Sequence, residues 1–320
     1  MATEPMRVED TVPASRRRSG DSPLSARYSI RVRLPLLISA LLAGTVATFL
    51  WAAYREVEAT LVRAGTDRAE GAAVQVANLL ERSVQQGAEN LRRVAADPDV
   101  RRYLQDPTDD AREAARKRLG SLAVGGPRRV ELWDAAGTRL LEITFQGSSV
   151  NAALGVPPPL TRPPTAGFSG LQASGNVAFT DSAAEILPQP STAGQAAASP
   201  HLGHLVVRST LVTSPSNILN RLVGGDALVE IGSMAGGVWS DLSRIVPAPP
   251  LETTPDGAAE YRAPAGAARL GAVSPIRGTP WLVAVEFARS SVVAPAKVFL
   301  RRMIMFGLVF VALGAIVVSR

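Results

Sequence analysis

The chain has 320 residues, 46% of them hydrophobic, which is enough for one large domain or two domains of ordinary size. Cysteine is absent, so disulfide frameworks, thiolate metal sites, iron–sulfur clusters and cysteine nucleophiles are excluded. The 34 basic and 28 acidic residues leave a modest surplus of +6. Aromatic residues make up 5% of the chain, which argues against a base-stacking surface, so we expect no nucleic-acid partner.

The N-terminal segment, residues 1–33, is polar and rich in Ser and Pro, with seven arginines against four acidic residues. This composition predicts a disordered tail. The run Arg16-Arg17-Arg18 could belong to an arm that binds nucleic acid, or to the basic cytoplasmic flank of a membrane span. The segment that follows favours the flank.

Residues 34–54 contain no charged residue over 21 positions. As a helix they would be about 31 Å long, which matches a hydrocarbon core of about 30 Å. Trp51 and Tyr54 stand at the far end, where interfacial aromatic residues are expected. A secretory signal peptide has the same order of parts, but its apolar region is usually about 7–15 residues long. The segment therefore predicts an uncleaved transmembrane helix.

A second uncharged run covers residues 303–319, and the predicted second transmembrane helix covers residues 298–320 if Arg301 and Arg302 extend toward the membrane surface. The alternative is a buried core helix. The arginines that flank the first span favour a cytoplasmic N-terminus. Two spans in a bacterial plasma (inner) membrane then place both termini in the cytoplasm and residues 55–302 outside.

Residues 55–127 are expected to form one long amphipathic helix, continuous with the first span, and a shorter second helix over about 109–122. Apolar residues at spacings of three and four give the long helix one apolar stripe. The stripe could pack against the chain's own domain or form the seam of a homodimer. The seam candidates are Val76, Leu80 and Val84.

Beyond residue 128 the pattern predicts strands. Residues 129–133 and 138–145 flank a polar turn and are typical of a β-hairpin. A short strand is expected at 176–180, a longer one at 202–212, and a closing pair at 269–276 and 281–287. The segment Val130–Gly137 resembles Val229–Gly236, which follows it by 99 residues. This repeat predicts two modules, over residues 128–213 and 214–297.

The helix that ends at Asp97-Pro98, the segment Val130–Gly137 and the closing run Gly278–Val283 follow one another in an order that resembles the double Cache sensor regions of bacterial membrane receptors. The resemblance implies an α+β fold, in which a long N-terminal helix is followed by two tandem PAS-like modules of antiparallel sheet. It also implies that residues 128–213 are the membrane-distal module and residues 214–297 the membrane-proximal one, with a transmembrane helix on each side.

The same resemblance implies that the exterior region binds a small ligand and signals through the second span. We expect the sensor part of a two-component histidine kinase whose output domains are missing from this chain. The alternatives are the sensor region of a diguanylate cyclase or chemoreceptor, and a stand-alone two-span protein whose exterior domain recruits a protein partner.

No enzymatic activity, cofactor or metal is expected for this chain, because it has no nucleotide-binding glycine motif and no nucleophile–base pair. His201 and His204 have a metal-like spacing, but positions three apart in a strand point to opposite faces. The candidate ligand-binding residues are Phe179 and Asp181, which follow a predicted strand between two loops. The alternative for Asp181 is that its side chain caps a turn.

Overall fold

The computed structural model describes residues 30–123, 126–146, 155–188, 201–211, 219, 222–251, 258–263 and 266–319. The predicted N-terminal tail lies outside these residues as far as residue 29. The chain divides into two units. One comprises Met1–Tyr54 with Leu300–Arg320, and the other comprises Arg55–Phe299.

Helix α1 covers Ile30–Ala95 and has 66 residues, so the prediction of one continuous helix through the first apolar run and the amphipathic stretch is confirmed. It ends where Asp97 and Pro98 begin a new helix. Among the described residues, one helical stretch, Leu37–Ala95, contains a window long and apolar enough to cross a membrane. The large apolar side chains in the first part of this stretch are exposed in this structure, with Leu37 at 69% and Phe49 at 73%.

Two short helices follow α1. Helix α2, Pro98–Gln105, is capped by Asp97, whose side chain accepts a hydrogen bond from the Asp99 amide at 2.9 Å. Helix α3, Asp109–Leu119, is capped in the same way by Thr108 and runs into the 3₁₀ turn η1, Gly120–Leu122. The sequence predicted α3 but not α2, whose eight residues begin with Pro98.

The first sheet is antiparallel, with the order β2-β1-β6-β5-β3, and β4 pairs with β5 as well. The predicted hairpin is confirmed as β1 and β2. The strand expected at 176–180 is longer than predicted, since β5 continues to Ile186. The bounds are β1 Arg128–Asp134, β2 Arg139–Phe145, β3 Gly167–Phe168, β4 Gln172–Ser174, β5 Val177–Ile186 and β6 Gly203–Thr210.

The second sheet repeats this arrangement. Its order from β10 to β8 is β10-β11-β12-β7-β8, and β9 pairs with β8. Strands β8, β7, β12, β11 and β10 of the second sheet therefore correspond in order to strands β2, β1, β6, β5 and β3 of the first sheet. Both copies of the sequence repeat form a strand and a turn, which ends at Gly137 (φ 81°) and Gly236 (φ 77°). The bounds are β7 Ala227–Ser233, β8 Trp239–Ser240, β9 Ile245–Val246, β10 Ala258–Arg262, β11 Ala268–Ile276 and β12 Trp281–Ala288.

After β12 the chain is helical again. Helix α5 covers Arg289–Val292 and helix α6 covers Ala294–Ser319. The closing strand pair was predicted, and residues 298–319 of the predicted second span lie in α6. The apolar side chains of α6 include large exposed ones, such as Phe306 and Phe310.

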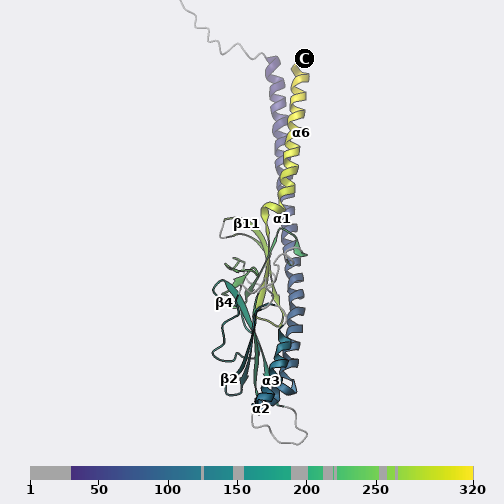
Figure 1. Ribbon diagram of the computed structural model, residues 1–320. Coiled ribbons are helices and arrows are strands. Elements are labelled where there is room, and N and C mark those ends of the chain that lie inside the picture. The colour runs from purple at the N-terminus through teal and green to yellow at the C-terminus, as the bar shows by residue number, and fades with distance from the viewer. Residues whose placement is uncertain are drawn as a thin grey trace, which may run out of the picture. The chain divides into compact units, whose positions relative to one another are not determined.

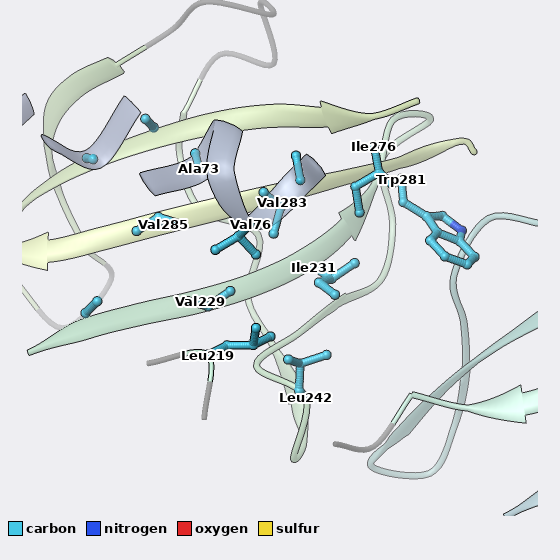
Figure 2. Close-up of a cluster of buried hydrophobic side chains, with 14 of the residues drawn as sticks. Ala73, Val76, Leu219, Val229, Ile231, Leu242, Ile276, Trp281, Val283 and Val285 are labelled. Atoms are coloured by element: carbon cyan, nitrogen blue, oxygen red, sulfur yellow. The ribbon is translucent and has the colours of Figure 1, made fainter. Parts of the chain in front are cut away.

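Helix α1 supplies one wall of the core for both sheets (Figure 1). Its Ala69–Ala77 stretch packs on the second sheet, where Ala73 and Val76 lie over Val229 and Val283 (Figure 2). Its Leu91–Ala95 stretch packs on the first sheet. Burial of this apolar stripe is what fixes the sheets on the helix.

The three seam candidates lie on this intramolecular face. Val76 is 4% exposed within the core of the second sheet, and Leu80 and Val84 are half-buried against the same core. These residues therefore make contacts within the chain, which agrees with the interpretation that the stripe packs against the chain's own domain. The homodimer seam itself stays a prediction.

Candidate ligand site

An ion pair is buried on the outer face of the first sheet, the face turned away from α1. Asp181 on β5 and Arg208 on β6 are cross-strand partners. Arg208 donates from Nε to Asp181 Oδ1 at 2.6 Å and from a terminal nitrogen to Oδ2 at 3.2 Å. The two residues are only 1% and 4% exposed. This two-point geometry is the strong form of a charge-assisted hydrogen bond.

The remaining donors of the Arg208 guanidinium are directed at the chain that covers the sheet. One terminal nitrogen donates to the Pro158 carbonyl at 2.5 Å, and the other donates to Gln172 Oε1 at 2.9 Å. Gln172 Nε2 in turn donates to Asp181 Oδ2 at 3.0 Å. The guanidinium also lies 4.6 Å from the centre of the Phe179 ring. The pair is thus satisfied internally and holds the chain above it in place.

We call residues 155–172 the covering segment. Its Ser169 accepts a hydrogen bond from the Trp281 indole nitrogen at 2.7 Å through its carbonyl, and another from the Asp181 amide at 2.9 Å through its hydroxyl. The neighbouring Phe168 ring meets the Trp281 ring edge-on at 5.5 Å. Since Trp281 is the first residue of β12, the covering segment joins the two sheets.

A second polar group lies beside this pair on the same face. Glu131 is completely buried. Its carboxylate accepts hydrogen bonds from Trp133 Nε1 at 3.1 Å, the Leu160 amide at 3.1 Å and Arg139 at 3.4 Å. Leu160 belongs to the covering segment, so this carboxylate also fixes that segment to the sheet.

Arg129 extends the polar face toward β2. It pairs with Glu142 and donates to the Pro157 carbonyl at 2.8 Å. Burial lowers the pKa of Arg129, Glu131 opposes this change, and Arg139 and Arg208 add to it. Three arginines and three carboxylates therefore balance one another on this face.

Open space lies at the free edge of the first sheet. A cavity of about 470 Å³ is bounded by α1 and α2 on one side and by β3, β5 and the covering segment on the other. This volume is in the range of small-molecule sites. Its wall is mostly apolar, with Leu91 and Phe168 among its members, and its polar members include Arg92, Arg101 and Glu185. Arg101 Nε is buried and has no hydrogen-bond partner among the described residues.

A smaller cavity of about 250 Å³ adjoins the first, and the two share Ala88, Arg92 and Phe168. It reaches the β11–β12 turn at Arg277 and Gly278. Phe168 therefore stands between open space next to the first sheet and the strand that leads toward α5.

From the sequence, Phe179 and Asp181 are candidate ligand-binding residues; the structure places both in the buried network, and neither is among the residues that line the two cavities. Arg208 and Gln172 were not proposed, although Arg208 is a lone charge inside a β-branched strand, which is a usable signal. His201 and His204 lie with ring centres 5.0 Å apart at the start of β6. Among the described residues, no group of three or more His, Cys, Asp or Glu side chains could hold a metal ion.

No protein-family model matches the sequence, and no curated protein matches it. Solved structures of similar arrangement do exist. One is a domain of a protein from Vibrio parahaemolyticus assigned to the sensory box/GGDEF family, with 10% identity, a TM-score of 0.45, and coverage of 73% of this chain and 98% of that one.

A second is the extracellular domain of a protein assigned as a histidine kinase, vpHK1S-Z8, with 12% identity, a TM-score of 0.46, and coverage of 74% of this chain and 96% of that one. A third is the ligand-binding domain of the Pseudomonas fluorescens chemoreceptor CtaA in complex with L-isoleucine, with 13% identity, a TM-score of 0.40, and coverage of 75% and 97%.

These three structures come from a sensory box/GGDEF family protein, a protein assigned as a histidine kinase and a chemoreceptor. Each TM-score is below 0.5, so the similarity concerns the general arrangement and identifies neither a ligand nor an output domain.

Proposed function

We propose that this chain is the extracytoplasmic sensor part of a bacterial membrane receptor and that a small ligand binds in the 470 Å³ cavity beside α1. In this proposal the first sheet belongs to the membrane-distal Cache module, and the second to the membrane-proximal one. The chain performs no chemical reaction itself. A histidine kinase is the proposed output, with a cyclase or chemoreceptor as the alternatives.

The observation that supports this proposal best is the position of the cavity. Its walls are α1 and α2 on one side and β3, β5 and the covering segment on the other, so a ligand there would contact both the long helix and the covering segment. The exposed arginine Arg92 and the partly buried Arg101 favour an anionic ligand, and Leu91 and Phe168 favour one with an apolar part. A small organic carboxylate fits both requirements.

Phe179 and Asp181 have a positioning role in this proposal. They hold Arg208, and Arg208 holds the covering segment through the Pro158 carbonyl. The segment's Phe168 forms a wall of the cavity and contacts Trp281 at the start of β12. A ligand that moves Phe168 would thereby act on β12, which continues into α5 and α6.

The ligand proposal is tested by melting the full chain in nanodiscs with sodium acetate, succinate or citrate, against sodium chloride at equal ionic strength. A carboxylate that binds the folded chain and is present at a concentration of 100 times its Kd should stabilise the chain by about 2.7 kcal/mol and raise its Tm. Arg101→Ala should abolish the shift because Arg101 lines the cavity, whereas Arg102→Ala, at the exposed neighbouring position, should keep it.

An equal shift in Arg101→Ala would place the ligand elsewhere. If none of the three carboxylates shifts the Tm, the cavity is not a carboxylate site, and the alternative of an exterior domain that recruits a protein partner gains support.

The membrane placement is tested with reporter fusions. We expect alkaline phosphatase to be active when fused after Tyr103, and a fluorescent protein to be fluorescent when fused after Arg320. The physical reason is the uncharged run of α1 with its arginine flank, together with the apolar helix α6 as a second span. An inactive phosphatase at Tyr103, or a dark fluorescent protein beside an active phosphatase at Arg320, would contradict the two-span topology.

A further inference from the structure

Glu131 and Glu230 occupy the same position in the two copies of the repeat, on β1 and β7. The flanking residues of each belong to the cores that face α1, so both carboxylates point to the outer face of their sheets. Both are buried, with exposures of 0% and 8%. They differ in what surrounds them.

In the first sheet the carboxylate of Glu131 accepts hydrogen bonds from three groups, one of them the indole of Trp133 two positions further on. The second sheet has Gly232 at the position of Trp133. A Cβ there would lie 2.2 Å from the ring of Trp239, so that ring fills the space over β7. Oε2 of Glu230 is buried without a hydrogen-bond partner among the described residues.

Four titratable groups of the second sheet surround Glu230: Glu286 on β12, Arg269 on β11, Tyr261 on β10 and Asp241 after β8. Arg269 donates to Glu286 at 2.8 Å, and the Tyr261 hydroxyl also donates to Glu286. Asp241 accepts from Ser243 and Arg244. The half-buried Arg269 is thus paired with Glu286, so this cation is already engaged by another carboxylate.

A buried carboxylate without its own cation is more stable with a proton than with a charge. Burial raises the pKa of Glu230 from its ordinary value of 4.5 to about 7, and the negative charge of Glu286 adds to this, while Arg269 opposes it. Glu286 is 4% exposed, so little solvent screens the repulsion between the two carboxylates.

We infer that Glu230 is a proton-binding site of the second sheet, through which the acidity outside the membrane modulates the signal. This inference is independent of the ligand cavity of the first sheet. When Glu230 loses its proton, a second negative charge appears beside Glu286 and competes for Arg269.

The proton site is connected to the helices that leave the domain. Glu286 lies three residues before Arg289, the first residue of α5. Arg289 bridges Glu58 on α1 at 2.6 Å and Glu260 on β10 at 2.8 Å. Glu260 precedes Tyr261, the partner of Glu286. A change in charge at Glu230 therefore acts on the ion pairs that tie β10, α1 and α5 together.

The test is infrared difference spectroscopy of the full chain in nanodiscs between pH 5.5 and 8.5. We expect the C=O band of a protonated carboxyl group to disappear with a midpoint near pH 7. Glu230→Gln should remove the band. Glu131→Gln is the matched control at the equivalent position, and it should keep the band because Glu131 is held by three donors.

Glu286→Gln should keep the band and lower its midpoint, because the repelling charge is removed, an effect that a purely structural role would not produce. The midpoint shift in Glu286→Gln also tests the inference if Glu230→Gln fails to fold. A band that persists in folded Glu230→Gln, an unmoved midpoint in Glu286→Gln, or no band in the wild type would overturn the inference.

Discussion

Asp181→Ala is expected to destabilise the exterior domain by about 3–5 kcal/mol, since it leaves the Arg208 guanidinium buried without its counter-ion. Gln172 and the Pro158 carbonyl accept hydrogen bonds from Arg208 but carry no negative charge. Urea denaturation of the full chain in detergent, followed by the far-UV circular dichroism of the sheets, measures the loss.

Two variants make this result specific. Asp67→Ala removes an exposed carboxylate of α1 and should change the stability by less than about 0.5 kcal/mol. The double variant Asp181→Leu with Arg208→Leu should be more stable than Asp181→Ala, because no unpaired charge remains buried. If Asp181→Ala is as stable as Asp67→Ala, the ion pair does not hold the covering segment, and the positioning role proposed for Asp181 is lost.

The elements of the fold that depend on residues close together in the sequence, such as hairpins and their turns, could be predicted. The hairpin β1–β2 has a polar turn that ends in Gly137, and the closing pair β11–β12 has one through Gly278, so turn chemistry alone locates both. Strand β5 was cut short because Asp181, Ser182 and the alanines after them have low strand propensity. Its pairing along the whole length of β6 overrides that propensity.

The candidate site could be predicted only in part, because its contacts are set by register and by tertiary packing. Asp181 and Arg208 are far apart in the sequence and become neighbours through the β5–β6 pairing. The cavity depends on where α1 lies against the edge of β5, which no motif specifies. The repeat in the sequence predicts that Glu131 and Glu230 occupy equivalent positions, but it does not predict that their surroundings differ.

The apolar stripe of α1 shows the same limit. A spacing of three and four residues says that one face of the helix is buried. It does not say whether the partner is the chain's own sheet or a second copy. Val76, Leu80 and Val84 lie against the second sheet, which accounts for the stripe within the chain, while the homodimer seam stays a prediction.

Val76→Asp is therefore expected to lower the free energy of unfolding of the exterior domain. Val76 is 4% exposed and lies with Ala73 over Val229, Val283 and Val285 (Figure 2). A carboxylate at this position has apolar neighbours on the sheet and no cation among the residues of this core. An uncompensated buried charge costs about 3–5 kcal/mol, so the unfolding midpoint in urea should fall sharply.

Val74→Asp is the matched control, because Val74 lies two residues away on the same helix and is 46% exposed. Its stability should stay within about 0.5 kcal/mol of the wild type. Sedimentation of both variants in detergent separates folding from association. If Val76→Asp melts as the wild type does but shifts a dimer toward monomer, the stripe is an intermolecular seam after all. If it unfolds at lower urea while the association of Val74→Asp is unchanged, the contacts of α1 are intramolecular and the dimer contact belongs elsewhere, with the span helices as the next candidates.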